Sequence, residues 1–89
     1  MKHFSEAFSS EKGYNMTDDE LFELFNSAMF DVADAHNISW ITLMSDTRSS
    51  MVAHEICKRL EIKRGVLEAY DNNIGIAYDK WLNKIYADI

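Results

Sequence analysis

Apolar residues recur at spacings of three and four over residues 21–33, and this pattern predicts a long amphipathic helix with one buried face. The preceding Thr-Asp-Asp-Glu at 17–20 has the form of a capping box. In such a box the Thr17 hydroxyl accepts a hydrogen bond from the Glu20 backbone amide, and the Glu20 side chain accepts one from the Thr17 amide. We therefore expect a core helix that begins after Thr17 and ends near Asn37.

The same spacing predicts four further helices. Ser39 is placed to cap a short second helix, and Asp46 to cap a third one from about residue 47 to residue 59. A fourth helix follows a turn, and the Asn-Asn-Ile-Gly sequence at 72–75 is expected to stop it before the last helix begins. The short second helix has apolar surface from Trp40, Ile41, Leu43 and Met44. The apolar residues expected to be buried in the other three helices are Met51, Val52, Ile56, Leu60, Val66, Leu67, Tyr70, Tyr78, Trp81, Leu82 and Ile85.

Length and composition favour one all-α domain. The 89 residues are 47% hydrophobic and include no proline and only three glycines, so the turn residues of sandwiches and barrels are missing. We expect a compact bundle of about five short helices that contains a helix-turn-helix-like pair. Residues 1–16 are expected to form a loosely ordered N-terminal arm, and residues 17–89 the single helical domain.

The cysteine content and the lengths of the apolar runs bear on location. The single cysteine, Cys57, cannot form an internal disulfide, which favours a reducing compartment and a cytoplasmic protein. No run approaches the roughly 20 apolar residues that a membrane-spanning helix needs. No apolar run behind a basic patch marks a secretion signal either. We therefore expect no contact with a membrane.

Charge is unevenly distributed around the net value of −6. Residues 1–37 hold eight acidic side chains against two lysines, whereas residues 38–64 carry a net charge of +2 and residues 65–89 one of −2. Attraction to phosphates depends on local potential more than on net charge. The basic middle is therefore compatible with a nucleic-acid face, while the acidic first part suits a solvated helix.

Residues 52–73 combine several features of a helix-turn-helix. The apolar Ile56 precedes the small Cys57, and the apolar Leu60 and Ile62 flank a turn. The apolar face of the second helix follows with Val66, Leu67 and Tyr70, and a polar stop comes at 71–73. This segment resembles the helix-turn-helix of the lambda-repressor-like (Cro and phage repressor) family. Two positions depart from the family pattern. Glu61 stands where glycine is preferred, because a left-handed backbone is costly for a residue with a side chain. Glu68 places an acid on the exposed face of the second helix.

The resemblance implies a small DNA-binding transcription regulator of phage or bacterial type. Such a protein is expected to be a homodimer, because one recognition helix buries little surface. Basic side chains would contact phosphates, and two asparagines the nucleic-acid backbone near the helix end. The residues expected to do so are Arg48, Lys58, Lys63, Arg64, Asn72 and Asn73.

A protein-binding module or inhibitor is the alternative function. Phe4 and Phe8 are one helical turn apart and can form an apolar edge that folds onto the body or onto a partner. Together with Asp18, Asp19 and Glu23 they would contact a basic protein partner. A phage-encoded anti-host factor or a DNA mimic would act in this way.

Candidate chemistry points away from an enzyme. The three histidines and Cys57 lack the spacing of metal ligands, and the three glycines are isolated, so no phosphate-binding loop is expected. No acid, base and nucleophile converge in the sequence. We expect no enzymatic activity, no cofactor and no metal site, with Cys57 buried and His36 at the end of the first long helix.

Overall fold

Five helices make up most of residues 14–45 and 48–89, the part of the chain that the computed structural model describes. They are α1 (Asp18–Ala35), α2 (Trp40–Ser45), α3 (Ser49–Leu60), α4 (Arg64–Leu67) and α5 (Asn73–Ala87). These two stretches contain no strand, so the expected all-α bundle is confirmed. None of their helices has the length and apolar character needed to cross a bilayer.

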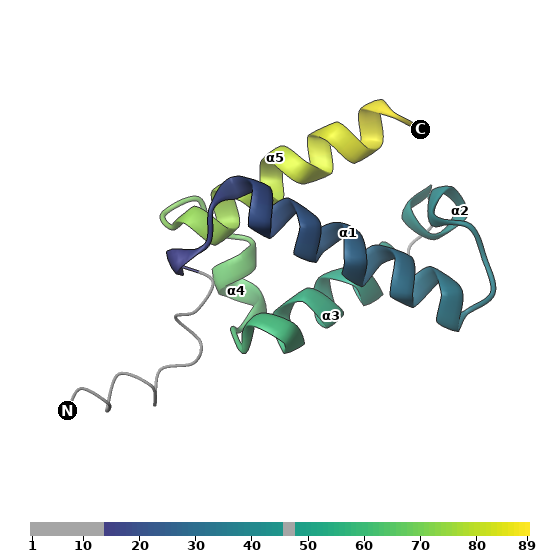
Figure 1. Cartoon of the computed structure of the whole chain (residues 1–89), viewed down its shortest axis with the longest axis horizontal. Coiled ribbons are helices and arrows are strands. Elements are labelled where there is room, and N and C mark those ends of the chain that lie inside the picture. Colours follow the sequence, from purple (N-terminus) through teal and green to yellow (C-terminus); the bar gives the residue numbers. More distant parts are fainter. Residues whose placement is uncertain (1–13, 46–47) are drawn as a thin grey trace.

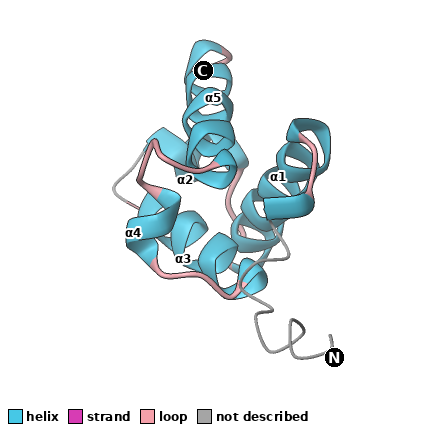
Figure 2. Cartoon of the chain, turned by 90° about the vertical axis from the view of Figure 1, so that its left-hand side faces the viewer, coloured by secondary structure: helices cyan, strands magenta, loops and turns pink. Residues whose placement is uncertain are grey.

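Helix α1 is the central element of the bundle (Figure 1). It packs against α3 on one side and α5 on the other, while α4 connects α3 with α5 and α2 lies beside the C-terminal part of α1. Figure 2 shows this arrangement turned by a quarter. The buried apolar side chains of all five helices form one cluster, so the helices share a single core.

The predicted start and buried face of α1 are confirmed. Thr17 Oγ1 accepts a hydrogen bond from the Glu20 amide at 3.1 Å, and Glu20 Oε1 accepts one from the Thr17 amide at 2.8 Å. The helix ends at Ala35, slightly before the expected Asn37, and His36 is its C-cap residue. The fully buried residues of α1 are Leu21, Phe25, Ala28, Met29 and Ala33.

The predicted cap residue of α2 is confirmed, whereas that of α3 is not tested. Ser39 caps α2 as predicted, because its Oγ accepts a hydrogen bond from the Thr42 amide at 3.1 Å. The expected cap of α3, Asp46, lies outside the described residues, and so does the expected first residue, Thr47. In the structure Arg48 is the N-cap residue of α3 and makes no side-chain cap hydrogen bond.

The second helix of the predicted helix-turn-helix is shorter than expected. Helix α4 has four residues and ends at Leu67, so the helix pair is not confirmed. Glu61, between α3 and α4, has φ 59° and ψ 45°, the left-handed conformation for which glycine is preferred. Tyr70 was predicted to lie in the core, but it is 71% exposed because the chain leaves the helix three residues earlier. That prediction is wrong.

The sequence at 72–75 starts a helix instead of stopping one, which corrects the predicted stop signal. Asn72 is the N-cap residue of α5, and its Oδ1 accepts a hydrogen bond from the Gly75 amide at 2.8 Å. A short amide side chain suits both helix ends, so the residue type alone did not decide between them. Gly75 is buried, and a Cβ atom there would overlap the backbone of Ala69. Its role is therefore close packing of the first turn of α5 on the α4–α5 turn.

Three aromatic rings join α1 to α5. The ring centroid of Phe25 lies 5.7 Å from that of Tyr78 and 5.5 Å from that of Trp81, and Tyr78 stacks on Trp81 at 6.0 Å. Trp81 is only 1% exposed, which confirms its predicted place in the core. Burial raises the pKa of Tyr78 to about 12, so its phenol stays neutral at physiological pH.

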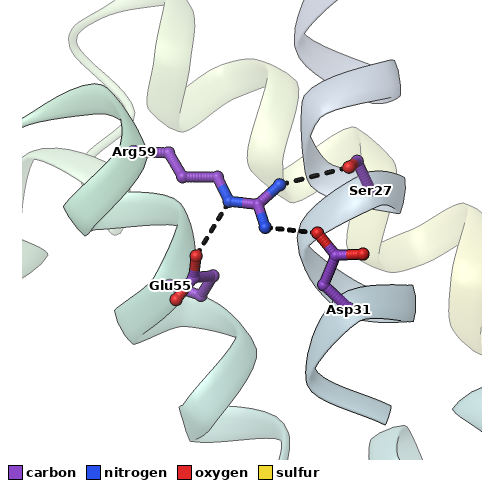
Figure 3. A network of polar contacts seen from close by, with 4 residues as sticks. All are labelled: Ser27, Asp31, Glu55 and Arg59. Atoms are coloured by element: carbon purple, nitrogen blue, oxygen red, sulfur yellow. Dashed lines mark hydrogen bonds and ion pairs between the residues drawn. The ribbon is translucent and has the colours of Figure 1, made fainter. Parts of the chain in front are cut away.

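A polar network joins α1 to α3 (Figure 3). The Arg59 guanidinium donates from Nε to Glu55 Oε2 at 2.9 Å, and across the interface to Ser27 Oγ at 3.1 Å and Asp31 Oδ2 at 2.6 Å. The hydrogen bonds to Asp31 and Glu55 raise the pKa of Arg59 above its usual value. This arginine is therefore engaged within the fold, although it belongs to the basic middle of the sequence.

Replacing Gly75 with alanine tests the close packing of α5. The added methyl group overlaps a backbone atom, so either α5 or the α4–α5 turn must shift, and we expect a loss of about 1–3 kcal/mol in the free energy of unfolding. Gly65→Ala is the matched control, because a Cβ at Gly65 meets no atom within 4 Å. Chemical denaturation followed by circular dichroism measures both. Equal stability of the two variants would contradict the close packing.

Candidate functional site

A hollow opens between α1, α2 and α5, which we call the aromatic groove. It has a volume of about 210 Å³ and is lined by Phe22, Asn26, Met29, Phe30, Trp40, Trp81, Lys84, Ile85 and Asp88. Helices α1 and α5 lie close together near their N-terminal ends and diverge toward their C-terminal ends (Figure 1). The groove is therefore built from segments that lie far apart in the sequence and meet only in the fold.

The hydrogen bond between Trp81 and Asn26 fixes the polar chemistry of the groove. Trp81 Nε1 donates to Asn26 Oδ1 at 2.8 Å. An indole nitrogen can only donate a hydrogen bond, so Asn26 must direct its Oδ1 atom toward Trp81. The Nδ2 atom of Asn26 then lies on the other side of the amide group. Within the described residues this nitrogen makes no hydrogen bond, which leaves a donor in the wall of the groove.

A cation lies at one end of the aromatic groove. The Nζ atom of Lys84 is 6.0 Å from the centroid of the Phe22 ring, at the outer limit of a cation–π contact. Phe30, farther along α1, is 47% exposed although it is a large apolar residue. The groove thus combines apolar surface that water still reaches with two hydrogen-bond donors, Asn26 Nδ2 and Lys84 Nζ.

The sequence did not predict this groove, although it held one signal. Asn26 is a polar residue within the aromatic spacing of Phe22 and Phe30, where a helix that only packs on a core would carry an apolar side chain. A predicted core tryptophan also needs an acceptor for its N–H group. Pairing Asn26 with Trp81 requires knowledge of a contact over 55 residues, which periodicity does not supply.

A second hollow lies at the turn between α3 and α4, and we call its surroundings the basic edge. Its volume is about 360 Å³, and its lining residues are His54, Cys57, Lys58, Glu61, Ile62 and Arg64. Lys58 and Arg64 were expected to contact nucleic acid, and Lys63 directly precedes Arg64 in the chain. The structure therefore brings part of the predicted nucleic-acid site together.

The other predicted nucleic-acid residues lie apart or are engaged. Arg48 is at the opposite end of α3 from Lys58, about 15 Å away along the helix axis. Besides capping α5, Asn72 donates from Nδ2 to the Val66 carbonyl oxygen at 3.1 Å. Asn73 is the first residue of α5. Of the predicted nucleic-acid residues, the basic edge thus keeps Lys58, Lys63 and Arg64.

Arg64 is partly neutralised at the basic edge. Its Nε lies 2.9 Å from Glu68 Oε2, and both side chains are about half exposed. The neighbouring thiol of Cys57 is buried, and burial raises its pKa, an effect that the positive charge of Arg64 partly opposes. A thiol with a raised pKa is a poor nucleophile at neutral pH, which agrees with the expected inert cysteine.

The acidic residues of the alternative prediction lie on the exposed surface of α1, which we call the acidic face. Asp18, Asp19 and Glu23 are exposed, and Asp18 Oδ2 lies 3.4 Å from the Nζ atom of Lys80 on α5. Phe4 and Phe8, the apolar part of that prediction, lie outside the described residues. In residues 14–45 and 48–89 no group of three or more His, Cys, Asp or Glu side chains is arranged to hold a metal ion.

Comparisons with protein-family models, with curated proteins and with solved structures give no match to this chain. The resemblance of residues 52–73 to the lambda-repressor-like family therefore stays a prediction. The functional interpretation depends on the geometry of the aromatic groove, the basic edge and the acidic face.

Proposed function

We propose that this protein acts by binding another protein, which inserts an apolar side chain into the aromatic groove. The observation that carries the proposal is the groove itself, a hollow in which aromatic and aliphatic side chains alternate with polar ones, with Phe30 half exposed and hydrogen-bond donors in its walls. Its 210 Å³ is below the roughly 300 Å³ at which pockets for drug-sized ligands begin. A single anchoring side chain of a protein partner suits this size better than a cofactor does.

The energetics of an inserted side chain support this function. An aromatic residue buries about 150–250 Å² on insertion, which is worth about 4–6 kcal/mol before the entropy cost of association is subtracted. Asn26 Nδ2 and Lys84 Nζ add specificity, because a partner without matching acceptors would leave these donors without water or a bond.

The acidic face supplies long-range attraction to the same partner. Asp18, Asp19 and Glu23 lie on α1, the helix that also provides Phe22 and Phe30 to the groove. A partner with basic residues around its apolar anchor would be steered toward this helix, and its association rate would fall as salt is added.

Nucleic-acid binding is the second candidate function, and the basic edge favours it. Lys58 and Arg64 line one open hollow at the α3–α4 turn, and Lys63 directly precedes Arg64, so positive charge that can attract phosphate groups gathers there. In this function the chain would be a homodimeric DNA-binding regulator of phage or bacterial type. The single turn of α4 and the Arg64–Glu68 ion pair both weaken the second candidate relative to the first.

Phe30→Glu tests protein binding through the aromatic groove. The immobilised wild-type chain is expected to capture a defined protein from a lysate of the source organism, and the variant to capture about tenfold less or lower still, since loss of a central anchor costs at least this factor. Tyr86→Glu is the matched control, because Tyr86 has nearly the same exposure, 48% against 47%, but does not line the groove. Capture that survives Phe30→Glu, with circular dichroism showing an intact fold, would contradict the proposal.

Chromatography on immobilised DNA tests the second candidate. If the basic edge binds phosphates, the wild-type chain is retained at about 50 mM salt, and replacing Lys63 and Arg64 with glutamate abolishes retention. Each lost phosphate contact lowers the slope of log affinity against log salt by about 1. Passage of the wild-type chain through the column without retention would exclude nucleic-acid binding.

A further inference from the structure

We propose that a hollow between the α4–α5 turn and α5, which we call the tyrosine pocket, binds the guanidinium group of an arginine side chain on a protein partner. Its volume is about 190 Å³, and its lining includes Leu67, Glu68, Tyr70, Tyr78, Asp79 and Leu82. It shares no lining residue with the aromatic groove, so it would be a second contact site. The inference rests on the proposed function only in placing the arginine on a protein.

Two tyrosine rings line the tyrosine pocket. Tyr70 is largely exposed in the α4–α5 turn, whereas Tyr78 is half-buried and is held in place by its ring contacts with Phe25 and Trp81. Within the described part of the chain the two tyrosine rings make no contact with each other, and the hollow lies against both. The face of an aromatic ring attracts a cation, and a planar guanidinium can also stack on it.

Asp79 gives the tyrosine pocket its charge complementarity to a cation. Its side chain is half-buried, and among the described residues its carboxylate accepts one hydrogen bond, from the Tyr70 hydroxyl to Oδ1 at 3.5 Å. The neighbouring cations are engaged elsewhere, because Lys80 pairs with α1 and Arg64 with Glu68. A hydrogen bond between ionised groups is about twice as strong as one between neutral groups, so an entering cation gains most at Asp79.

The other groups of the tyrosine pocket favour arginine over lysine. The Tyr78 hydroxyl makes no hydrogen bond within the described residues and stays neutral at physiological pH, so it can accept one as Asp79 does. A guanidinium presents five donors in a planar fork and can bond several acceptors at once, whereas an ammonium is a compact and strongly hydrated charge. The weaker hydration of the guanidinium also suits the apolar walls that Leu67 and Leu82 provide.

Titration of the full chain with N-acetyl-arginine amide, followed by the nuclear magnetic resonance signals of the tyrosine rings, tests the inference. The ring signals of Tyr70 and Tyr78 are expected to shift as the arginine amide binds. N-acetyl-citrulline amide has nearly the same shape without the charge, and it is expected to bind at least about tenfold more weakly. Equal affinity for the citrulline amide or for N-acetyl-lysine amide, or tyrosine signals that stay unchanged throughout the titration, would overturn the inference.

Asp79→Asn places the binding in the tyrosine pocket. This variant is expected to lower the affinity for the arginine amide at least about tenfold while the helical circular dichroism is retained. Asp71→Asn is the matched control, because Asp71 is an exposed acid beside Tyr70 that does not line the pocket. Equal affinities of the two variants would overturn the inference. Phe30→Glu is expected to leave the affinity for the arginine amide unchanged, so failure of this inference and failure of the proposed function are distinguishable.

Discussion

The packing of Trp81 against α1 is the interaction on which the rest of the structure depends. Trp81 is the largest fully buried side chain, and its indole N–H would be left without a partner in the core if Asn26 did not accept it at 2.8 Å. Such an unsatisfied group costs about 1–3 kcal/mol, and each ring contact with Phe25 and Tyr78 adds about 0.5–1.5 kcal/mol. One residue thus holds α5 on α1 and also supplies the floor of the aromatic groove.

Features that depend on neighbours in sequence were predictable. The Thr17 capping box, the buried stripe of α1 and the core position of Trp81 each follow from spacings of three or four residues, and each is confirmed. The prediction that Tyr70 is buried was wrong, because its helical spacing from Val66 did not reveal that the helix ends at Leu67. The prediction that Asn72 belongs to a helix stop was wrong, because its side chain suits the end of one helix as well as the start of the next.

The candidate site was less predictable than the fold, because its parts meet only in three dimensions. The groove joins α1 with Trp40 and with residues of α5, and the role of Asn26 is set by a partner 55 residues away. The charge pattern of the sequence likewise does not reveal which charged side chains are paired. Arg59 belongs to the basic middle of the sequence, yet it is engaged by Asp31 and Glu55, and so the basic edge is smaller than composition suggests. The contacts in the structure, and not the composition, show which basic side chains stabilise the fold and which can bind a partner.

The indole N–H resonances of the two tryptophans test most directly whether the groove above Trp81 is a binding surface. A Trp40→Phe variant assigns the two signals, and the free chain is then compared with the chain bound to the protein that it captures. Our account predicts that the Trp81 proton exchanges slowly in both, because it is buried and bonded to Asn26. The Trp40 resonance should shift between the two forms, because Trp40 lines the groove. An unchanged Trp40 resonance, together with a Trp81 proton that exchanges as fast as in a free indole, would contradict the account.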